Sequence, residues 1–123
     1  MYKKKHILVI DDELSWQILL QRYLENKGFA VRTVGSATEA FKILSSYKPD
    51  LIMTDIRMPD MNGFDFLLEL KQQAPFTSTP VVFLSGIDDY EARKVAKSLG
   101  AVDYLVKPLN EQDIDSILSK VLL

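Results

Sequence analysis

Three apolar runs in this chain each end at charged residues. Residues 6–10 are followed by Asp11 and Asp12, residues 51–54 by Asp55, and residues 102–106 by Lys107. If these runs are neighbouring parallel strands, their carboxyl ends lie at one edge of a sheet, which is where open α/β folds bind their ligands. The sequence therefore predicts one pocket that contains three carboxylates and one ammonium group.

Short runs rich in β-branched residues alternate with longer helical patterns, five times along the chain. This alternation is typical of β-α-β units, which form a parallel sheet with helices on both faces. We expect strands at residues 7–10, 30–34, 51–54, 81–84 and 102–106. All except the second are almost continuously apolar, as strands buried on both faces are. The predicted fold class is α/β, a doubly wound (βα)5 arrangement around a five-stranded parallel sheet.

The helices between these strands are marked by apolar spacing and by end signals. The first is expected at residues 14–26, followed by Gly28, with an inward face formed by Trp16, Leu19, Leu20, Tyr23 and Leu24. The fourth is expected to bury Ala92, Val95, Ala96 and Leu99 before Gly100. Ser36 with Glu39 forms a capping box for the second helix, and Asn110 is an N-cap for the fifth. The third begins near Phe64 and is stopped by Pro75.

Length and composition favour a single domain over residues 1–123, with enough chain to bury a core. The formal charge of −2, from 15 basic and 17 acidic residues, argues against direct nucleic-acid binding, which requires a basic face. No apolar run approaches the roughly 20 residues of a membrane span. The chain contains no cysteine, which is compatible with a reducing compartment, and we expect a cytoplasmic location.

The predicted pocket has a specific chemistry. Two carboxylates about 4 Å apart repel each other by about 4 kcal/mol at an effective dielectric constant of 20, so such a site needs a cation. Oxygen ligands without His or Cys suit a hard divalent ion such as Mg²⁺. Lys107 and Ser85 are suited to bind phosphate oxygens. Taken singly, Asp11 and Asp12 are also ordinary residues for a helix start and Asp55 for a turn, but together they indicate phosphoryl transfer to an Asp.

Asp55 is followed by the motif Met58-Pro59-Asp60-Met61-Asn62-Gly63, and Lys107 is followed by Pro108. With these features the chain resembles a CheY-like receiver domain of two-component response regulators over almost its full length. The resemblance implies a flavodoxin-like sheet in the order 2-1-3-4-5. It implies that Mg²⁺, or Mn²⁺, is bound by Asp11, Asp12, Asp55 and the backbone carbonyl of Arg57. It also implies that Asp55 is the phosphoacceptor, that Lys107 and Ser85 are catalytic, that Ser85 and Tyr104 form a switch, and that the peptide bond before Pro108 is cis.

The same resemblance implies a phosphorylation-dependent signalling switch rather than an enzyme, one that catalyses only its own phosphorylation and dephosphorylation. The phosphoryl donor would be a sensor histidine kinase or a histidine phosphotransfer protein, which we expect to contact Leu14 and Ile18. The readout would be a surface change around the fourth helix, fifth strand and fifth helix, sensed by a downstream effector, an output domain or a phosphorylation-dependent homodimer. Lys94, Lys97, Asp103 and Asp115 are expected on that face. Arg57 and Ile87 are expected to influence the phosphoryl lifetime.

Other functions remain open from the sequence. The chain is either a stand-alone receiver or the receiver of a larger regulator, and a receiver-like scaffold that is never phosphorylated is a further alternative. A small phosphohydrolase with an Asp nucleophile usually has a second carboxylate two residues later, where this chain has Arg57. A flavin-binding flavodoxin relative requires a phosphate loop after the first strand, where Asp11-Asp12-Glu13 would repel the phosphate.

Overall fold

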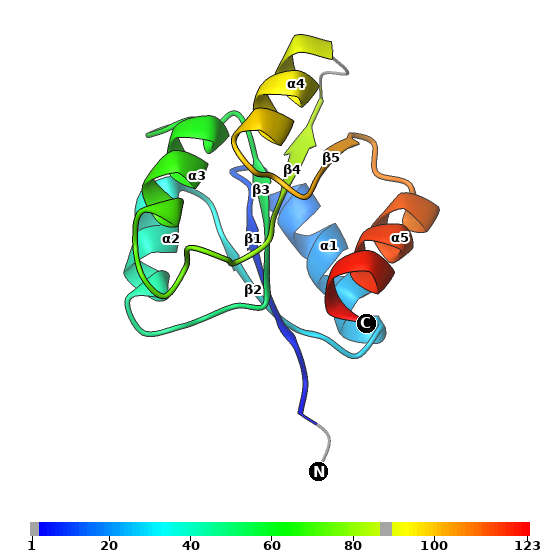
Figure 1. Ribbon diagram of the computed structural model, residues 1–123. Coiled ribbons are helices and arrows are strands. Elements are labelled where there is room, and N and C mark those ends of the chain that lie inside the picture. The colour runs from blue at the N-terminus through cyan, green and yellow to red at the C-terminus, as the bar shows by residue number, and fades with distance from the viewer. Residues whose placement is uncertain (1–2, 87–89) are drawn as a thin grey trace.

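The computed structural model describes residues 3–86 and 90–123, in which five parallel strands form one sheet between helices (Figure 1). The strands are β1 (His6–Ile10), β2 (Ala30–Val34), β3 (Leu51–Asp55), β4 (Val81–Ser85) and β5 (Asp103–Val106). They lie in the order β2-β1-β3-β4-β5, and every neighbouring pair is parallel. The predicted fold class and strand order are confirmed, and each predicted strand end lies within one residue of the observed one.

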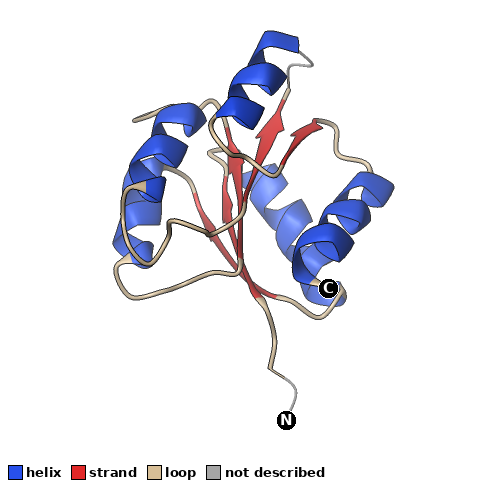
Figure 2. Cartoon of the chain, viewed as in Figure 1, coloured by secondary structure: helices blue, strands red, loops and turns tan. Residues whose placement is uncertain are grey.

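Helices cover both faces of this sheet, which runs through the middle of the molecule (Figure 2). They are α1 (Leu14–Asn26), α2 (Ala37–Leu44), α3 (Gly63–Lys71), α4 (Tyr90–Ser98) and α5 (Glu111–Leu122). Buried residues of α1 and α5 pack on one face of the sheet, whereas those of α2, α3 and α4 pack on the other. This is the doubly wound arrangement that the alternating sequence predicts.

The molecule has one apolar core on each face of the sheet, because successive side chains of a strand point to opposite faces. In β1, Val9 points toward Leu20 and the other buried residues of α1 and α5, whereas Leu8 and Ile10 belong to the core that contains Phe66 of α3. All of these side chains are fully buried, and burying one such side chain contributes about 1.5–3 kcal/mol. A continuously apolar strand is therefore required, because both of its faces are covered.

The helix ends are largely as predicted. The Ser36 hydroxyl accepts a hydrogen bond from the Glu39 N–H at 3.1 Å, and the Asn110 side chain accepts one from the Gln112 N–H at 2.7 Å. The Glu39 carboxylate, however, accepts from the Gly35 N–H rather than from that of Ser36. Gly28, which follows α1, has a φ of +97°, a conformation that glycine adopts without steric cost.

Two residues predicted to face inward are exposed instead. Leu19 of α1 is 53% exposed and Val95 of α4 is 39% exposed. Leu19 lies next to the buried Leu20, and both line a hollow of about 120 Å³ beside Leu109. In α4 only Ala96 is fully buried, so that the apolar stripe along this helix is narrower than its spacing suggests.

Asp115 is also placed differently from the expectation. It was expected on the face of α4, β5 and α5, but its carboxylate accepts a hydrogen bond from the Tyr23 hydroxyl at 2.6 Å and therefore joins α5 to α1. This hydrogen bond is the largest of the effects that raise the pKa of Tyr23 to about 12. Helices α1 and α5 are thus held together by a polar contact beyond their shared apolar core.

Within residues 3–86 and 90–123, no helix combines the length and the apolar character that crossing a lipid bilayer requires.

Candidate functional site

The register of the sheet brings the charged strand ends together. Ile10 pairs with Thr54 across β1 and β3, so the residues that follow them, Asp11 and Asp55, are neighbours. Ser85 pairs with Val106 across β4 and β5, and Lys107 comes directly after it. The Lys107 N–H donates to the Ser85 carbonyl at 2.7 Å, which extends the ladder to this residue. Parallel pairing therefore places the predicted site residues at one edge.

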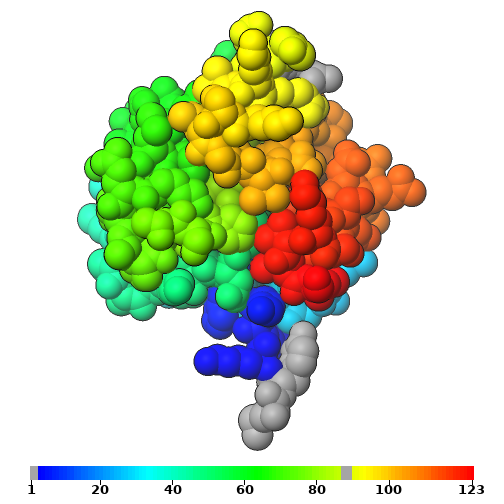
Figure 3. Space-filling model, in the orientation of Figure 1, coloured from blue at the N-terminus to red at the C-terminus, as the bar shows by residue number. Residues whose placement is uncertain are grey.

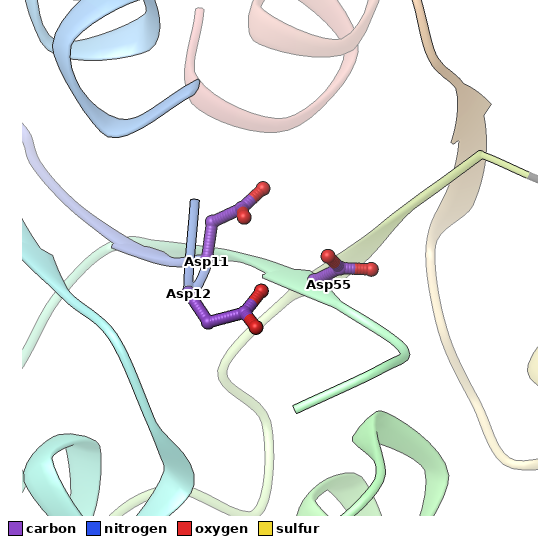
Figure 4. A group of neighbouring side chains, drawn as sticks. All are labelled: Asp11, Asp12 and Asp55. Carbon is purple, nitrogen blue, oxygen red and sulfur yellow. The ribbon is translucent and has the colours of Figure 1, made fainter. Parts of the chain in front are cut away.

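Three carboxylates face a common space at this edge. Asp11, Asp12 and Asp55 each have an oxygen within 4.8 Å of an oxygen of the other two. Figure 4 shows the side chains of Asp11 and Asp12 extending from the end of β1 toward the side where Asp55 ends β3. Asp11 and Asp55 are buried, whereas Asp12 is exposed. The group is thus open to solvent at Asp12 and closed behind Asp11.

The ammonium group of Lys107 lies among these carboxylates. Its Nζ atom is 2.6 Å from Asp11 Oδ2 and 3.3 Å from Asp55 Oδ2, and the side chain is only 8% exposed. Burial alone would lower the pKa of Lys107, but the hydrogen bond to Asp11 and the negative charges of Asp55 and Asp11 outweigh burial and raise it. Lys107 therefore remains a cation in the pocket.

Asp55 is held in a different electrostatic balance. Burial raises the pKa of its carboxyl group above the ordinary value, the charge of Lys107 opposes this shift, and the charge of Asp11 adds to it. Asp55 Oδ1 also accepts a hydrogen bond from the Arg57 N–H at 3.3 Å. Its ionised form is thus stabilised by one cation and opposed by a second carboxylate, and such a group favours the approach of a further cation.

The backbone behind Asp55 is packed too closely for any side chain at position 63. A Cβ atom added to Gly63 would lie 2.6 Å from the Asp55 carbonyl oxygen and 3.0 Å from the ring of Phe83. The Gly63 N–H donates to the Ile56 carbonyl at 2.7 Å. The glycine that ends the motif after Asp55 is therefore needed because α3 begins directly against the strand end.

Asp60, in the loop between β3 and α3, caps the N-terminus of α2. Its carboxylate accepts hydrogen bonds from the Ala37 N–H at 3.2 Å and the Thr38 N–H at 2.8 Å, and from the Thr38 hydroxyl. The hydrogen bonds from Thr38 lower the pKa of Asp60. Together with Ser36, Asp60 satisfies the free amides of the first turn of α2. The loop after Asp55 is consequently fastened to α2.

An open hollow of about 420 Å³ lies over these groups, lined by Asp12, Glu13, Asp55, Arg57, Ser85, Gly86 and Lys107. Ser85 is buried at its wall, and the predicted residues of the pocket other than the fully buried Asp11 thus share one cavity. The donor atoms are carboxylate oxygens without nitrogen or sulfur, which fits a hard divalent cation such as Mg²⁺. The acidic group could therefore hold such an ion, whereas the role of the Arg57 carbonyl as a ligand stays a prediction.

Tyr104 lies apart from the pocket, on β5. Its ring is buried in the core shared with α2, α3 and α4, and the guanidinium group of Arg93 lies 5.0 Å from the ring centroid. The structure thus has the ring in its inward position, and its movement as a switch stays a prediction. The expected cis peptide bond before Pro108 is present. Ile87 lies outside the described residues.

Sequence reasoning missed two neighbours of the pocket. Gln17 donates from its side-chain amide to the Asp11 carbonyl at 2.6 Å, and the ring of Trp16, which we expected in the core, is only partly buried and lies beside Lys107. Both follow Asp11 by about one and a half helical turns, and this short separation was the available signal. Whether a residue of α1 lies near these groups depends on how the helix is rotated about its axis, and the apolar spacing did not fix that rotation.

Comparisons with known proteins identify the family of the chain. Residues 7–119 match the family described as the response regulator receiver domain. The chain is 36% identical over 119 residues to the DNA-binding transcriptional regulator NtrC of Proteus hauseri, and 35% identical over 118 residues to the alkaline phosphatase synthesis transcriptional regulatory protein PhoP of Bacillus subtilis. These matches include 97% and 96% of this chain, but only 24% of NtrC and 48% of PhoP.

Among solved structures, the chemotaxis response regulator CheY4 of Vibrio cholerae has the same fold, with a TM-score of 0.90 and 29% sequence identity. That match covers 98% of this chain and all of CheY4. The curated relatives named above are two to four times longer than the part that this chain matches. The family match, the strand order and the acidic edge agree with one another, and the chain belongs to the response regulator receiver domains of two-component signalling systems.

Proposed function

We propose that residues 1–123 form a single receiver domain in which Asp55 accepts a phosphoryl group from a phosphohistidine of a partner. One observation carries the proposal: the Asp55 carboxylate opens into a solvent-accessible hollow, with the ammonium group of Lys107 3.3 Å away and two further carboxylates beside it. Phosphoryl transfer depends mostly on positioning and on charge neutralisation, and this pocket has groups for both.

In the transfer step, an oxygen of Asp55 forms the new P–O bond while the P–N bond to the donor imidazole breaks. Lys107 and Ser85 line the same hollow and bind the phosphoryl oxygens, Lys107 through its charge and Ser85 through its hydroxyl. Asp11, Asp12 and Asp55, with the Arg57 carbonyl, would hold Mg²⁺ or Mn²⁺. The bound ion would neutralise negative charge that develops on the phosphoryl oxygens.

The reverse chemistry belongs to the same pocket. Water that enters the hollow hydrolyses the acyl phosphate, and the exposed side chain of Arg57 at its rim restricts this entry. The domain thus catalyses its own phosphorylation and dephosphorylation but turns over no separate substrate. The family supports the role of a regulator.

The phosphorylated state is read on the surface formed by α4, β5 and α5, whose yellow, orange and red atoms adjoin in Figure 3. A hollow of about 390 Å³ on this surface is lined by Arg93 and Tyr104 and by residues of α5 such as Lys120. Movement of Ser85 toward the phosphoryl group would change the space beside Tyr104, because β4 and β5 are adjacent. The surface then binds an effector, an output domain or a second copy of the chain.

The phosphoryl donor is a sensor histidine kinase or a histidine phosphotransfer protein that docks on α1. Leu14 and Ile18 are exposed on this helix, which begins directly after the pocket residues Asp12 and Glu13, and Leu19 is a further exposed apolar residue of α1. The output is less defined: NtrC and PhoP are named as transcriptional regulators, and this chain matches only part of each. We propose that the chain acts in the cytoplasm as a receiver that controls a downstream protein.

The direct test uses acetyl phosphate as a small donor. Wild-type protein with Mg²⁺ is expected to gain one phosphoryl group per chain by intact-protein mass spectrometry, and Asp55→Asn is expected to gain none. Asp65→Asn, at an exposed position of α3, is the matched control and is expected to be phosphorylated like the wild type. EDTA is expected to abolish uptake, and excess Mg²⁺ to restore it.

A receiver-like scaffold that is never phosphorylated predicts a different result. In that case the wild type would gain no phosphoryl group from acetyl phosphate, and beryllofluoride with Mg²⁺ would leave its NMR spectrum unchanged. Equal phosphorylation of the wild type and of Asp55→Asn would instead assign the acceptor to another residue. Either result would overturn the proposed function.

A further inference from the structure

Trp16 is the only tryptophan in the chain, and its ring lies against the lysine of the pocket. The Nζ atom of Lys107 is 5.1 Å from the centroid of the Trp16 ring and lies over it. Trp16 belongs to the first turn of α1, a few residues after the acidic pair Asp11-Asp12, and its side chain is only partly buried. Trp16 thus contacts a residue that lines the pocket and is not part of the core between α1 and the sheet.

The ammonium group of Lys107 contacts two carboxylates and one aromatic ring. The carboxylates are those of Asp11 and Asp55, at 2.6 Å and 3.3 Å. Both belong to the group proposed to bind the metal ion, and Asp55 is also the proposed acceptor. When these carboxylates are engaged in that way, their attraction for Lys107 is reduced, since other cations and the phosphoryl group compete for the same oxygens. The indole ring takes no part in this competition.

We propose that Trp16 is a positioning residue for Lys107, which keeps the ammonium group at the pocket wall through a cation–π contact while Asp11 and Asp55 are occupied. This inference rests on the proposed function of Asp55 as the phosphoacceptor. The indole ring has the strongest attraction for a cation among the aromatic side chains, and the contact strengthens when the cation is removed from water. Lys107 is 8% exposed, so this condition is met.

A plain packing role makes different predictions. If Trp16 only covered apolar surface, then leucine would replace it well, because leucine is also apolar and favours helices. If Trp16 acts through its π face, then phenylalanine replaces it in part and leucine does not. The two substitutions therefore separate the electrostatic role of the ring from its volume.

The kinetic test is a double-mutant cycle with acetyl phosphate and saturating Mg²⁺. Trp16→Leu is expected to slow phosphorylation about threefold to tenfold, and Trp16→Phe by no more than about twofold, as expected for a cation–π contact. In the slower Lys107→Met background, Trp16→Leu is expected to have no further effect, because the cation is already absent. Tyr47→Leu is the matched control: Arg32 lies 5.1 Å from the centroid of that ring, outside the pocket, and the rate is expected to be unchanged.

A second measurement reports the contact itself and needs no phosphorylation. In the NMR spectrum of the metal-free protein, the ε-methylene protons of Lys107 are expected to be shifted upfield by the indole ring. The shift is expected to disappear in Trp16→Leu and to persist in part in Trp16→Phe. Urea unfolding of each variant shows whether it is folded under the conditions of the assay.

Three results would overturn the positioning role. They are equal slowing by Trp16→Leu in the wild-type and Lys107→Met backgrounds, a wild-type rate in Trp16→Leu, and Lys107 protons without an upfield shift. A wild-type protein that takes up no phosphoryl group would instead refute the proposed function, and the positioning role with it. The uptake assay on the unaltered protein therefore distinguishes the two failures.

Discussion

The ammonium group of Lys107 lies closer to Asp11 than to Asp55, at 2.6 Å against 3.3 Å. Asp11 is fully buried at the end of β1, and its other oxygen accepts a hydrogen bond from the Glu13 N–H. The lysine thus neutralises mainly the carboxylate that has least access to water. A metal ion that binds this group must share Asp11 with a cation already in the pocket.

Removal of that cation is therefore expected to strengthen metal binding. In Lys107→Met, Asp11 and Asp55 lose a positive charge at contact distance, and Mg²⁺ meets less repulsion. A change of about 1–2 kcal/mol is expected for charges at this range in a partly screened pocket, which lowers the dissociation constant roughly fivefold to thirtyfold. Calorimetric titration with Mg²⁺ measures the change. Unchanged or weaker binding would contradict it.

The stability of the protein is expected to depend on pH through Asp55. Because the folded state raises the pKa of this carboxyl group, ionisation of Asp55 opposes folding. The stability associated with the protonated form is present below 3.8, the ordinary pKa of the group, and is lost as the pH rises through the folded-state pKa. The side chain of Asn at position 55 does not ionise, so Asp55→Asn does not lose this stability. Its free energy of unfolding is expected to exceed that of the wild type slightly near pH 4 and by more at pH 7.

Urea unfolding of both proteins without metal, at the two pH values, measures this difference. A wild type that is more stable than Asp55→Asn at pH 7 would show that Lys107 outweighs burial and the charge of Asp11. If Asp55→Asn is more stable than the wild type by the same amount at both pH values, then the difference does not arise from ionisation of Asp55.

Gly63→Ala is expected to destabilise the protein and displace Asp55. The new methyl group would lie 2.6 Å from the Asp55 carbonyl oxygen, so the strand end or the start of α3 must shift. The expected loss is about 1–3 kcal/mol in the free energy of unfolding, as for other overpacked sites. Gly86→Ala is the matched control, because its Cβ atom meets nothing within 4 Å, and its effect is expected to stay below about 0.5 kcal/mol. Urea unfolding of both variants provides the comparison.

Ile18→Asp is expected to weaken transfer from the protein donor while uptake from acetyl phosphate is nearly unchanged. Ile18 is 44% exposed on α1 and does not line the pocket. The expected loss in the transfer rate is about tenfold, as for an apolar interface residue with an average contribution to binding. Leu68→Asp on α3, where the residue is 46% exposed, is the matched control and is expected to leave both rates unchanged. Equal losses with both donors would exclude a docking role.

Much of the site was predictable because it depends on strand register. Once residues 7–10 and 51–54 are assigned as adjacent parallel strands, Asp11 and Asp55 must be neighbours, and no side-chain detail is needed. Positions on the helices were less predictable, since a rotation of α1 by one residue exchanges an inward for an outward side chain. Leu19 and Trp16 were misplaced for this reason.

Contacts between distant elements could not be predicted from local patterns. Tyr23 and Asp115 are 92 residues apart, and neither belongs to a motif that indicates the other. The bond between Asp60 and Thr38 spans 22 residues and depends on where the loop after β3 lies relative to α2. These contacts form only after the sheet and its helices are assembled, so only the tertiary structure reveals them.

The Asp60 cap has a mechanical consequence for the edge of the sheet beside β2. The chain from Asp55 to Asp60 is only a few residues long, and its far end is tied to the amides of Ala37 and Thr38. If the acceptor loop is pulled toward an added group, it must either break these hydrogen bonds or draw α2 along with it. In the second case the strand edge farthest from β5 would move as well, so that one chemical event at Asp55 would deform the molecule in two directions.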